Sequence, residues 1–282
     1  MALPSSVIEE RIEARPNPRQ EAAAGVRSAR SRSRSTGTWV RGLLGVLLLA
    51  AIWELAPRLG LVDSYFFPPL HVVLQTWWEM VRDGEMWKHT RASLIRAGVG
   101  FATALVVAIP LGAAVAWYRP VRELLTPSME FFRNTAALAL LPVFTLVLGI
   151  GELSKIAIVF YACFFPILLS TIAGVATVDP QLLRSARVLG LSPSATFRKV
   201  VFPAAVPTIF TGIRISGAAA ILVLIAAEMV GANAGLGFLI NYAQYNFLIP
   251  KMYAAILTTS LLGLAVNYGL VALEKRFSRW RV

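Results

Sequence analysis

Six apolar segments, separated by shorter polar stretches, follow one another along the chain after residue 38. They cover residues 40–56, 97–118, 127–148, 153–178, 204–230 and 253–273. Each is near the length of about 20 residues that an α-helix needs to cross a hydrocarbon layer about 30 Å thick. Prolines inside these segments, such as Pro110 and Pro166, are compatible with this interpretation, because neighbouring membrane helices satisfy the freed backbone groups. The pattern predicts an all-α fold, a polytopic membrane bundle of six transmembrane helices.

The composition supports a membrane protein and gives it an orientation. Hydrophobic residues make up 57% of the chain and charged residues only 15%, whereas soluble proteins carry roughly a quarter charged residues. If the N-terminus is cytoplasmic, the cytoplasmic segments hold 18 of the 27 Lys and Arg residues and the outer segments hold 7. The positive-inside rule therefore predicts an inner-membrane protein with both termini in the cytoplasm. The net charge of +12 is then a topology signal, and no nucleic-acid partner is expected.

Two stretches outside the apolar segments have a distinct composition. Residues 1–38 are rich in Arg and Ser and are predicted to form a disordered cytoplasmic tail, followed by a membrane domain over 39–282. The outer stretch 71–91 is mildly amphipathic and contains Trp77, Trp78 and Trp87. Indole side chains prefer the lipid headgroup region. This stretch is predicted to be an interfacial helix that anchors the second apolar segment, the alternative being a docking site for an external partner.

The polar loop at about 179–202, between the fourth and fifth segments, predicts two short helices. Asp179 before a proline is typical of a helix N-cap, and Gly190 is typical of a helix C-cap. Ser192 then begins a second short helix, which Pro203 is expected to stop. Such a protrusion has an apolar ridge that could dock in a partner's groove or lie on its own bundle. The residues alone favour neither alternative.

This loop resembles the EAA loop of ABC importer permeases. The resemblance rests on Ala186, Gly190, Pro203 and Pro207, in the pattern Ala-x3-Gly followed by Pro-x3-Pro. Further matching stretches occur in the same order, at residues 149–155, 165–166, 178–180 and 227–237. Over residues 40–282 the chain is similar to the nitrate/sulfonate/taurine/bicarbonate branch of these permeases.

The resemblance implies the type I ABC importer permease fold and a set of partners. It implies a permease homodimer in the lipid bilayer, two copies of a cytoplasmic ATP-binding subunit, and an extracytoplasmic substrate-binding protein. ATP and magnesium are expected on the ATPase subunit, since this chain contains no P-loop motif. The chain itself is predicted to have no catalytic residue, no metal and no cofactor.

The residues implied to couple the loop to the ATPase form one group. They are Arg184, Ser185, Ala186, Gly190, Phe197 and Pro203. Arg184 stands where the family has an acidic residue, and Ser185 occupies the next position. A carboxylate contact with the ATPase therefore cannot be transferred to this chain.

Ionisable side chains inside the membrane indicate a candidate translocation path, because each costs roughly 2.5–3.5 kcal/mol at a helix centre. Arg133, with Asn134 and Thr135 as hydrogen-bond donors, and Glu228 are the predicted contacts for an anionic substrate. The alternative for the charged residues is an intramembrane Glu–Arg pair, or a side chain whose charged end extends to the membrane interface. The glycine-rich turn from Gly231 to Gly237 is expected to shape the outer gate.

The predicted substrate is a small anion, with an aliphatic sulfonate or taurine first and nitrate or bicarbonate next. A neutral heterocyclic vitamin precursor is the alternative within the family. A stand-alone secondary transporter or channel would show inverted repeats, and no convincing repeat is present. An intramembrane hydrolase needs a base beside a nucleophile, but His71 and His89 both fall outside the membrane in the predicted topology.

Overall fold

The structure is a computed structural model that describes residues 41–277, which form two compact units divided between Leu70 and His71. The predicted tail at 1–38 lies outside the described residues. In the smaller unit, residues 41–58 form a helix that corresponds to the first apolar segment. Trp53 of this helix donates a hydrogen bond from Nε1 to the carbonyl of Pro68 (3.1 Å) and stacks at a tilt on Phe67.

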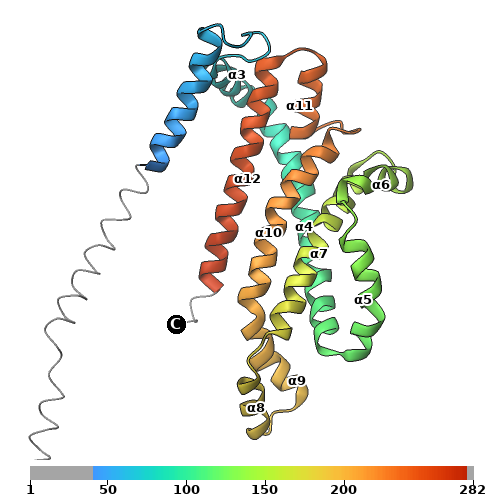
Figure 1. The fold of residues 1–282 in the computed structure, drawn as a ribbon. Coiled ribbons are helices and arrows are strands. Elements are labelled where there is room, and N and C mark those ends of the chain that lie inside the picture. Colours follow the sequence, from blue (N-terminus) through green and yellow to red (C-terminus); the bar gives the residue numbers. More distant parts are fainter. Residues whose placement is uncertain (1–40, 278–282) are drawn as a thin grey trace, which may run out of the picture. The chain divides into compact units, whose positions relative to one another are not determined.

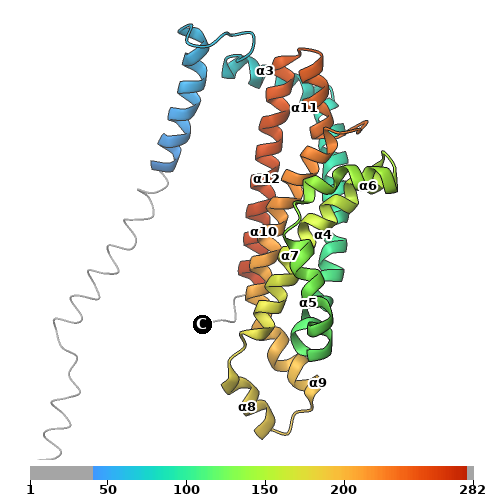
Figure 2. The same cartoon turned by 45° about the vertical axis from the view of Figure 1, so that its right-hand side comes forward.

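The larger unit is helical throughout its described residues. Its elements are α3 (Leu70–Arg82, beginning at the boundary), α4 (Glu85–Trp117), α5 (Arg119–Arg133), η1 (Ala137–Leu140), α6 (Leu141–Leu148), α7 (Glu152–Ala176), α8 (Pro180–Val188), α9 (Pro193–Thr196), η2 (Phe197–Val201), α10 (Phe202–Glu228), α11 (Leu236–Tyr245) and α12 (Ile249–Phe277). Helices α4, α7 and α10 lie side by side and form the centre of the unit (Figures 1 and 2), with α12 packed against α10 and α11. Helices α8 and α9 lie at one end of these three helices, and α11 lies at the other.

Four helices of the described part are long and apolar enough to cross a membrane. They are Glu85–Trp117, Glu152–Ala176, the continuous helix Pro193–Glu228, and Ile249–Arg276. A fifth span is present if Arg119–Arg133 and Ala137–Leu148 are counted together, although these two are bent by 89°. The all-helical membrane fold is confirmed, and the described residues give four or five spans where the sequence predicted six.

The third predicted segment, 127–148, is a broken helix. The side-chain amide of Asn134 donates to the carbonyl of Glu130 (2.7 Å) at the last turn of α5. Such a side chain competes with the regular backbone ladder. The chain then turns extended at Ala136 and resumes in η1 and in α6, where Pro142 occupies the first turn. A proline is favoured there, since that position has no intrahelical N–H partner to lose.

Close packing of the central helices depends on small residues of α10, among them Gly212 and Ser216. A Cβ atom at Gly212 would lie 2.9 Å from the carbonyl oxygen of Pro166 in α7. The hydroxyl of Ser216 donates to the carbonyl of Cys163, also in α7 (3.2 Å). Membrane helices approach closely where such residues face each other, because packing rather than hydrophobicity drives their association.

The expectation that Pro203 stops the second short helix is wrong, because the helix from Pro193 runs on to Glu228. The backbone before the proline widens into a π turn over Phe197–Val201, in which the N–H of Phe202 bonds to the carbonyl of Phe197. Proline normally disrupts a helix by clashing with the carbonyl four residues earlier. A π turn at this point changes the local bonding register, and the helix continues through Pro203.

The stretch 71–91, predicted as one interfacial helix, is divided in the structure: α3 ends at Arg82, and residues 85–91 begin α4. The anchor of α3 also differs from the expectation. Nε1 of Trp77 donates to Oγ1 of Thr258 in α12 (2.9 Å), rather than to a residue of the second segment. Trp78 and Trp87 are exposed. Helix α11 was not predicted from the sequence; it begins at Leu236, so the stretch predicted as a glycine-rich turn up to Gly237 already includes its first two residues.

Candidate functional site

The loop of residues 179–202, which we call the α8–α9 loop, has its two helix ends fixed by capping bonds. The carboxylate of Asp179 accepts from the N–H of Gln181 (2.7 Å), as predicted for an N-cap. Gly190 has φ +69°, and the N–H of Leu191 donates back to the carbonyl of Ala186 (3.1 Å). This is the Schellman arrangement, which favours glycine at the left-handed position. The Ser192 hydroxyl caps the next helix by accepting from the N–H of Ala195 (3.3 Å).

The tip of the α8–α9 loop exposes apolar side chains. Leu182, Val188 and Leu189 are 46%, 88% and 76% exposed. Beside them, Arg184 and Ser185 are also exposed, whereas Ala186 of the same helix is buried. Four cations and no carboxylate occur between residues 180 and 202. An apolar ridge with a basic surround is a surface that fits an apolar groove with acidic neighbours.

The α8–α9 loop is joined to the bundle through aromatic contacts. The ring of Phe197 packs edge-on against Trp117 at the end of α4, with centroids 5.1 Å apart. The ring centroids of Phe197 and Phe202 lie 6.2 Å apart, and Val201, which directly precedes Phe202 in the sequence, is buried. Pro203 follows in the first turn of α10. The loop is therefore in direct contact with the end of α4 and is continuous with α10.

A second feature is a cavity of about 470 Å³ at the break between α5 and η1. It is lined by Arg133, Asn134, Thr135, Ala137, Tyr161, Ala162, Phe165, Pro166, Leu169, Ala219 and Val223. Non-helical backbone at membrane depth is tolerated where it borders a cavity or is buried in protein. Discontinuous helices of this kind form the substrate sites of many transporters.

The cavity has one cationic edge. The Arg133 guanidinium pairs with Glu130 (2.9 Å) and is 41% exposed, so this ion pair leaves part of the cation accessible. The hydroxyl of Tyr161 donates to the carbonyl of Phe132 (2.7 Å), which ties the broken end of α5 to α7. The structure thus brings Arg133, Asn134 and Thr135 together at one cavity, which a small anion could enter.

Glu228 lies elsewhere, in a buried group of polar side chains at the α11 end of the helices. Its carboxylate is fully buried and accepts from Nη1 of Arg96 (2.7 Å), from the hydroxyl of Ser93 (2.8 and 2.9 Å) and from the N–H of Gly237 (3.0 Å). We call Ser93, Arg96, Glu152 and Glu228 the Arg96 network. The pairing of Glu228 with an intramembrane arginine is the alternative that the sequence left open.

Arg96 is the centre of this network and connects three helices and a loop. Its Nε and Nη2 atoms donate to the two carboxylate oxygens of Glu152 in α7, each at 2.5 Å, a bidentate pair. Nη1 also donates to the carbonyl of Ala234 (2.6 Å). The Arg96 side chain is 4% exposed, whereas that of Glu152 is 67% exposed. Bidentate pairs of this type combine charge with a fixed geometry.

Further side chains bind the backbone of the glycine-rich turn. Nδ1 of His89 accepts from the N–H of Gly235 (3.1 Å), and the Ser93 hydroxyl accepts from the N–H of Leu236 (2.8 Å). Nζ of Lys155, which is 1% exposed, donates to the carbonyl of Gly231 (3.0 Å). The turn is therefore bound from α4, α7 and α10 at once.

Sequence reasoning found Glu228 but missed its partners. Arg96 was counted among the outer cations, although it directly precedes the second apolar segment and is four residues before Gly100 on the packed side of α4. The available signal was that a buried charge requires a partner. Two carboxylates, Glu152 and Glu228, border apolar segments and could have been matched to it.

The fold is similar to that of solved ABC transporter structures. A chain of the inward-facing MetNI methionine ABC transporter matches with a TM-score of 0.59 at 19% identity, covering 71% of this chain and 96% of that one. A crystal structure of an amino acid ABC transporter with histidines gives a TM-score of 0.54, also at 19% identity, over 71% of this chain and 98% of that one. These matches show the fold, an all-helical bundle like that of the matched ABC transporter chains.

Residues 108–279 match the family described as binding-protein-dependent transport system inner membrane component. The putative aliphatic sulfonates transport permease protein SsuC of Bacillus subtilis is 32% identical, over 86% of this chain and 88% of its own length. The taurine transport system permease protein TauC of Escherichia coli is 34% identical, over 85% and 88%. The nitrate import permease protein NrtB of Synechocystis is 36% identical, over 65% and 66%.

The chain belongs to this family of ABC importer permeases. It is a multi-pass inner-membrane component and not itself an enzyme, and membership implies ATPase and binding-protein partners. The family has no cofactor, and ATP is bound by the partner ATPase.

Proposed function

We propose that this permease moves a small anion into the cytoplasm, with an aliphatic sulfonate or taurine as the leading substrate and nitrate or bicarbonate next. The observation that carries the proposal is the cavity at the break after α5, where Arg133, Asn134 and Thr135 converge. A guanidinium suits sulfonate, carboxylate and nitrate groups, because its planar set of donors matches their oxygens. Relatives with sulfonate, taurine and nitrate in their names support the same class.

The topology we propose has six spans, with both termini in the cytoplasm. Residues 41–58 form the first span, and the bent pair of α5 with η1 and α6 forms the third. The 18 residues of the first helix correspond to roughly 27 Å at 1.5 Å per residue, close to the hydrocarbon thickness. In this orientation the α8–α9 loop is cytoplasmic and the Arg96 network lies at the outer end.

The assembly we propose is a permease homodimer with two ATPase subunits and one binding protein. The exposed ridge of Leu182, Val188 and Leu189 enters a groove of the ATPase. Gly190 fixes the angle between the two short helices, and Phe197 transmits the movement to Trp117. ATPase closure then rocks the helices about the translocation path, as in other alternating-access transporters.

Individual residues of the α8–α9 loop have different proposed roles. Arg184 and Ser185 are exposed on α8, so they face the ATPase, and Arg184 would pair with an acidic residue there. Ala186 is buried and supports the turn from inside the loop. Pro203 follows the π turn and marks the joint between the loop and α10.

For Glu228 we propose a positioning role in the translocation path. Both of its carboxylate oxygens already accept hydrogen bonds from Arg96, Ser93 and the N–H of Gly237, so neither is free to bind a solute. It therefore acts on the solute through the glycine-rich turn that it holds.

The substrate and the role of Arg133 can be tested with the full transporter in proteoliposomes. ATP-dependent uptake of labelled taurine should be competed by alkanesulfonates, and weakly or not at all by a neutral thiamin precursor such as an aminopyrimidine. Arg133→Ala should reduce uptake by about tenfold or more, since a hydrogen bond to a charged group contributes roughly 1.5–3 kcal/mol. Arg58→Ala is the matched control, because Arg58 also pairs with a glutamate of its own helix, Glu54, but does not line the cavity.

The outcomes separate the parts of the proposal. Unchanged uptake by Arg133→Ala would remove Arg133 from the path. Competition by the neutral compound alone would replace the anion by the vitamin-precursor alternative. Uptake that needs neither ATP nor the binding protein would refute the importer itself.

A further inference from the structure

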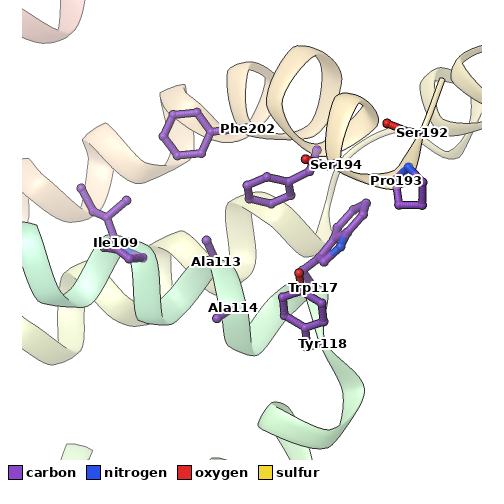
Figure 3. Close-up of a pocket in the computed structure, with 11 residues that line it drawn as sticks. Ile109, Ala113, Ala114, Trp117, Tyr118, Ser192, Pro193, Ser194 and Phe202 are labelled. Atoms are coloured by element: carbon purple, nitrogen blue, oxygen red, sulfur yellow. The ribbon is translucent and has the colours of Figure 1, made fainter.

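A groove of about 740 Å³ lies between the end of α4 and the helix that leaves the α8–α9 loop (Figure 3). Its lining residues are Ile109, Pro110, Ala113, Ala114, Trp117, Tyr118, Ser192, Pro193, Ser194, Phe197 and Phe202. From Ile109 to Trp117 the groove extends over nine residues of α4, which is roughly 12 Å along the helix axis at 1.5 Å per residue. It is separate from the cavity that contains Arg133.

The groove changes in polarity from one end to the other. Ile109 and Phe202 lie at one end, and Ala113 lies between this end and Trp117 (Figure 3). Trp117 and Tyr118, together with the hydroxyls of Ser192 and Ser194, lie at the opposite end. Tryptophan and tyrosine are enriched where a membrane meets water. The groove thus has an apolar inner part and a polar, aromatic mouth, which is the layout that an amphiphile requires.

The mouth of the groove is basic. Arg119 follows Tyr118 directly; it is exposed and pairs with Glu123 of its own helix (2.8 Å). Arg198 is four residues after Ser194 and four before Phe202, so it lies on or near the helix face that borders the groove. Arg198 and Lys199 are exposed, and no ion pair involves either of them within residues 41–277. A phosphate group at this mouth would find cations without a competing carboxylate between residues 180 and 202.

We propose that this groove is a binding site for an anionic phospholipid. One acyl chain lies against Ile109, Ala113 and Phe202, and the phosphate lies at the mouth near Ser194, Arg119 and Arg198. Basic pockets between membrane helices recognise such head groups. The assignment of this lipid to the cytoplasmic leaflet rests on the topology proposed above. The binding of the lipid to the groove does not depend on that topology.

The position of the groove gives the lipid a consequence for transport. The edge-on contact between Trp117 and Phe197 forms part of its wall, and this contact joins the α8–α9 loop to α4. A lipid in the groove fills the space beside the contact and supports the loop against the bundle. The coupling of ATP hydrolysis to uptake should therefore depend on the charge of the surrounding lipid.

Quenching of Trp117 fluorescence by brominated lipid tests the site in the complete transporter, assembled with its ATPase in nanodiscs. The chain contains 7 tryptophans, so the signal of Trp117 is taken as the difference between the wild type and Trp117→Phe. Brominated phosphatidylglycerol should quench this signal with an affinity about fivefold higher than brominated phosphatidylcholine, since one cation near an anionic surface contributes about 1 kcal/mol. Arg198→Gln should bring this ratio close to one.

Matched variants separate the groove from general lipid contact. Ala113→Phe should abolish quenching of Trp117, with Ala114→Phe as a second filling variant if the first does not assemble. Ala102→Phe, at an exposed alanine of the same helix, should leave it unchanged, as should Arg187→Gln on α8. Equal quenching by the two lipids would mean ordinary surrounding lipid and would overturn the proposal. Absence of quenching at Trp117 in the assembled complex would show that the ATPase covers the groove, with the same consequence.

Discussion

The two ends of the helix Pro193–Glu228 are built on opposite principles. At the Glu228 end, buried charges and hydroxyls bind one another and the backbone of the following turn, so that α4, α7 and α10 are connected through side chains. At the Pro193 end, the helix ends of the α8–α9 loop are fixed by local caps, and the side chains of Leu182, Val188 and Leu189 are exposed. One end satisfies its own polar groups, and the other leaves apolar surface for a partner.

This difference indicates how the work of an importer is divided along one helix. Charges buried in a membrane protein are costly unless they are paired, and once paired they fix a geometry. The Arg96 network therefore makes its end of the bundle a rigid unit. The α8–α9 loop instead leaves Leu182, Val188 and Leu189 exposed, and in the assembly proposed above the ATPase moves it through this ridge.

The largest effect is expected for Arg96→Met, which should destabilise the Glu228 end of the helix. This change leaves Glu228 buried without its cation, and removing one partner of a buried pair costs about 3–5 kcal/mol. The thermal midpoint of the purified complex, measured by differential scanning fluorimetry in detergent, should fall strongly. Arg91→Met, at an exposed arginine of the same helix, is the control and should leave the midpoint in place. A midpoint as high as that of the control would mean that the Arg96 network does not stabilise this end.

A smaller effect is expected for Gly190→Ala at the other end. Gly190 has φ +69°, and a residue with a Cβ atom in this conformation costs roughly 1–2 kcal/mol. The α8–α9 loop should lose its angle, so that uptake and the stimulation of ATP hydrolysis by the binding protein both decline while the fold persists. Gly263→Ala in α12, where an added Cβ meets nothing within 4 Å, is the matched control. If both variants transported alike, the geometry of the turn would be irrelevant to coupling.

The smallest effect should come from Asp179→Ala, which removes the N-cap of α8. The loss of such a cap costs about 1 kcal/mol. Amide hydrogen exchange in α8 should accelerate by about fivefold, with no change at the Arg96 network. Asp63→Ala removes a comparable short-range bond, to the N–H of Tyr65, and should leave exchange in α8 unaltered. Acceleration spread over α4 and α7 would contradict the independence of the two ends.

Much of the fold could be predicted because a long apolar segment is by itself sufficient to predict a membrane helix. The helices α4, α7, α10 and α12 were all expected, and so were the caps at Asp179 and Gly190. These features depend on residues close in sequence. Local chemistry is enough to predict them.

What could not be predicted depends on contacts between distant residues. The bidentate pair of Arg96 with Glu152 joins positions 56 residues apart, and the hydrogen bond from Ser93 to Glu228 joins positions 135 apart. The continuation of the helix through Pro203 depends on a π turn. From the sequence alone, the proline predicts that the helix stops. The break after Arg133 depends on a competing bond of Asn134, which hydrophobicity alone does not reveal.

The central claim is that the exposed ridge of the α8–α9 loop is the contact through which a separate ATPase drives this permease. Co-purification of the ATPase with the Val188→Asp, Leu189→Asp double variant tests it most directly. The control is the Leu59→Asp, Leu61→Asp double variant, which changes two equally exposed leucines outside the loop. Retention of the ATPase should fall by at least about tenfold for the ridge variant, as for an interface hot spot, at an unchanged thermal midpoint, and should persist in the control. Undiminished retention with normal ATP-driven uptake would contradict the claim.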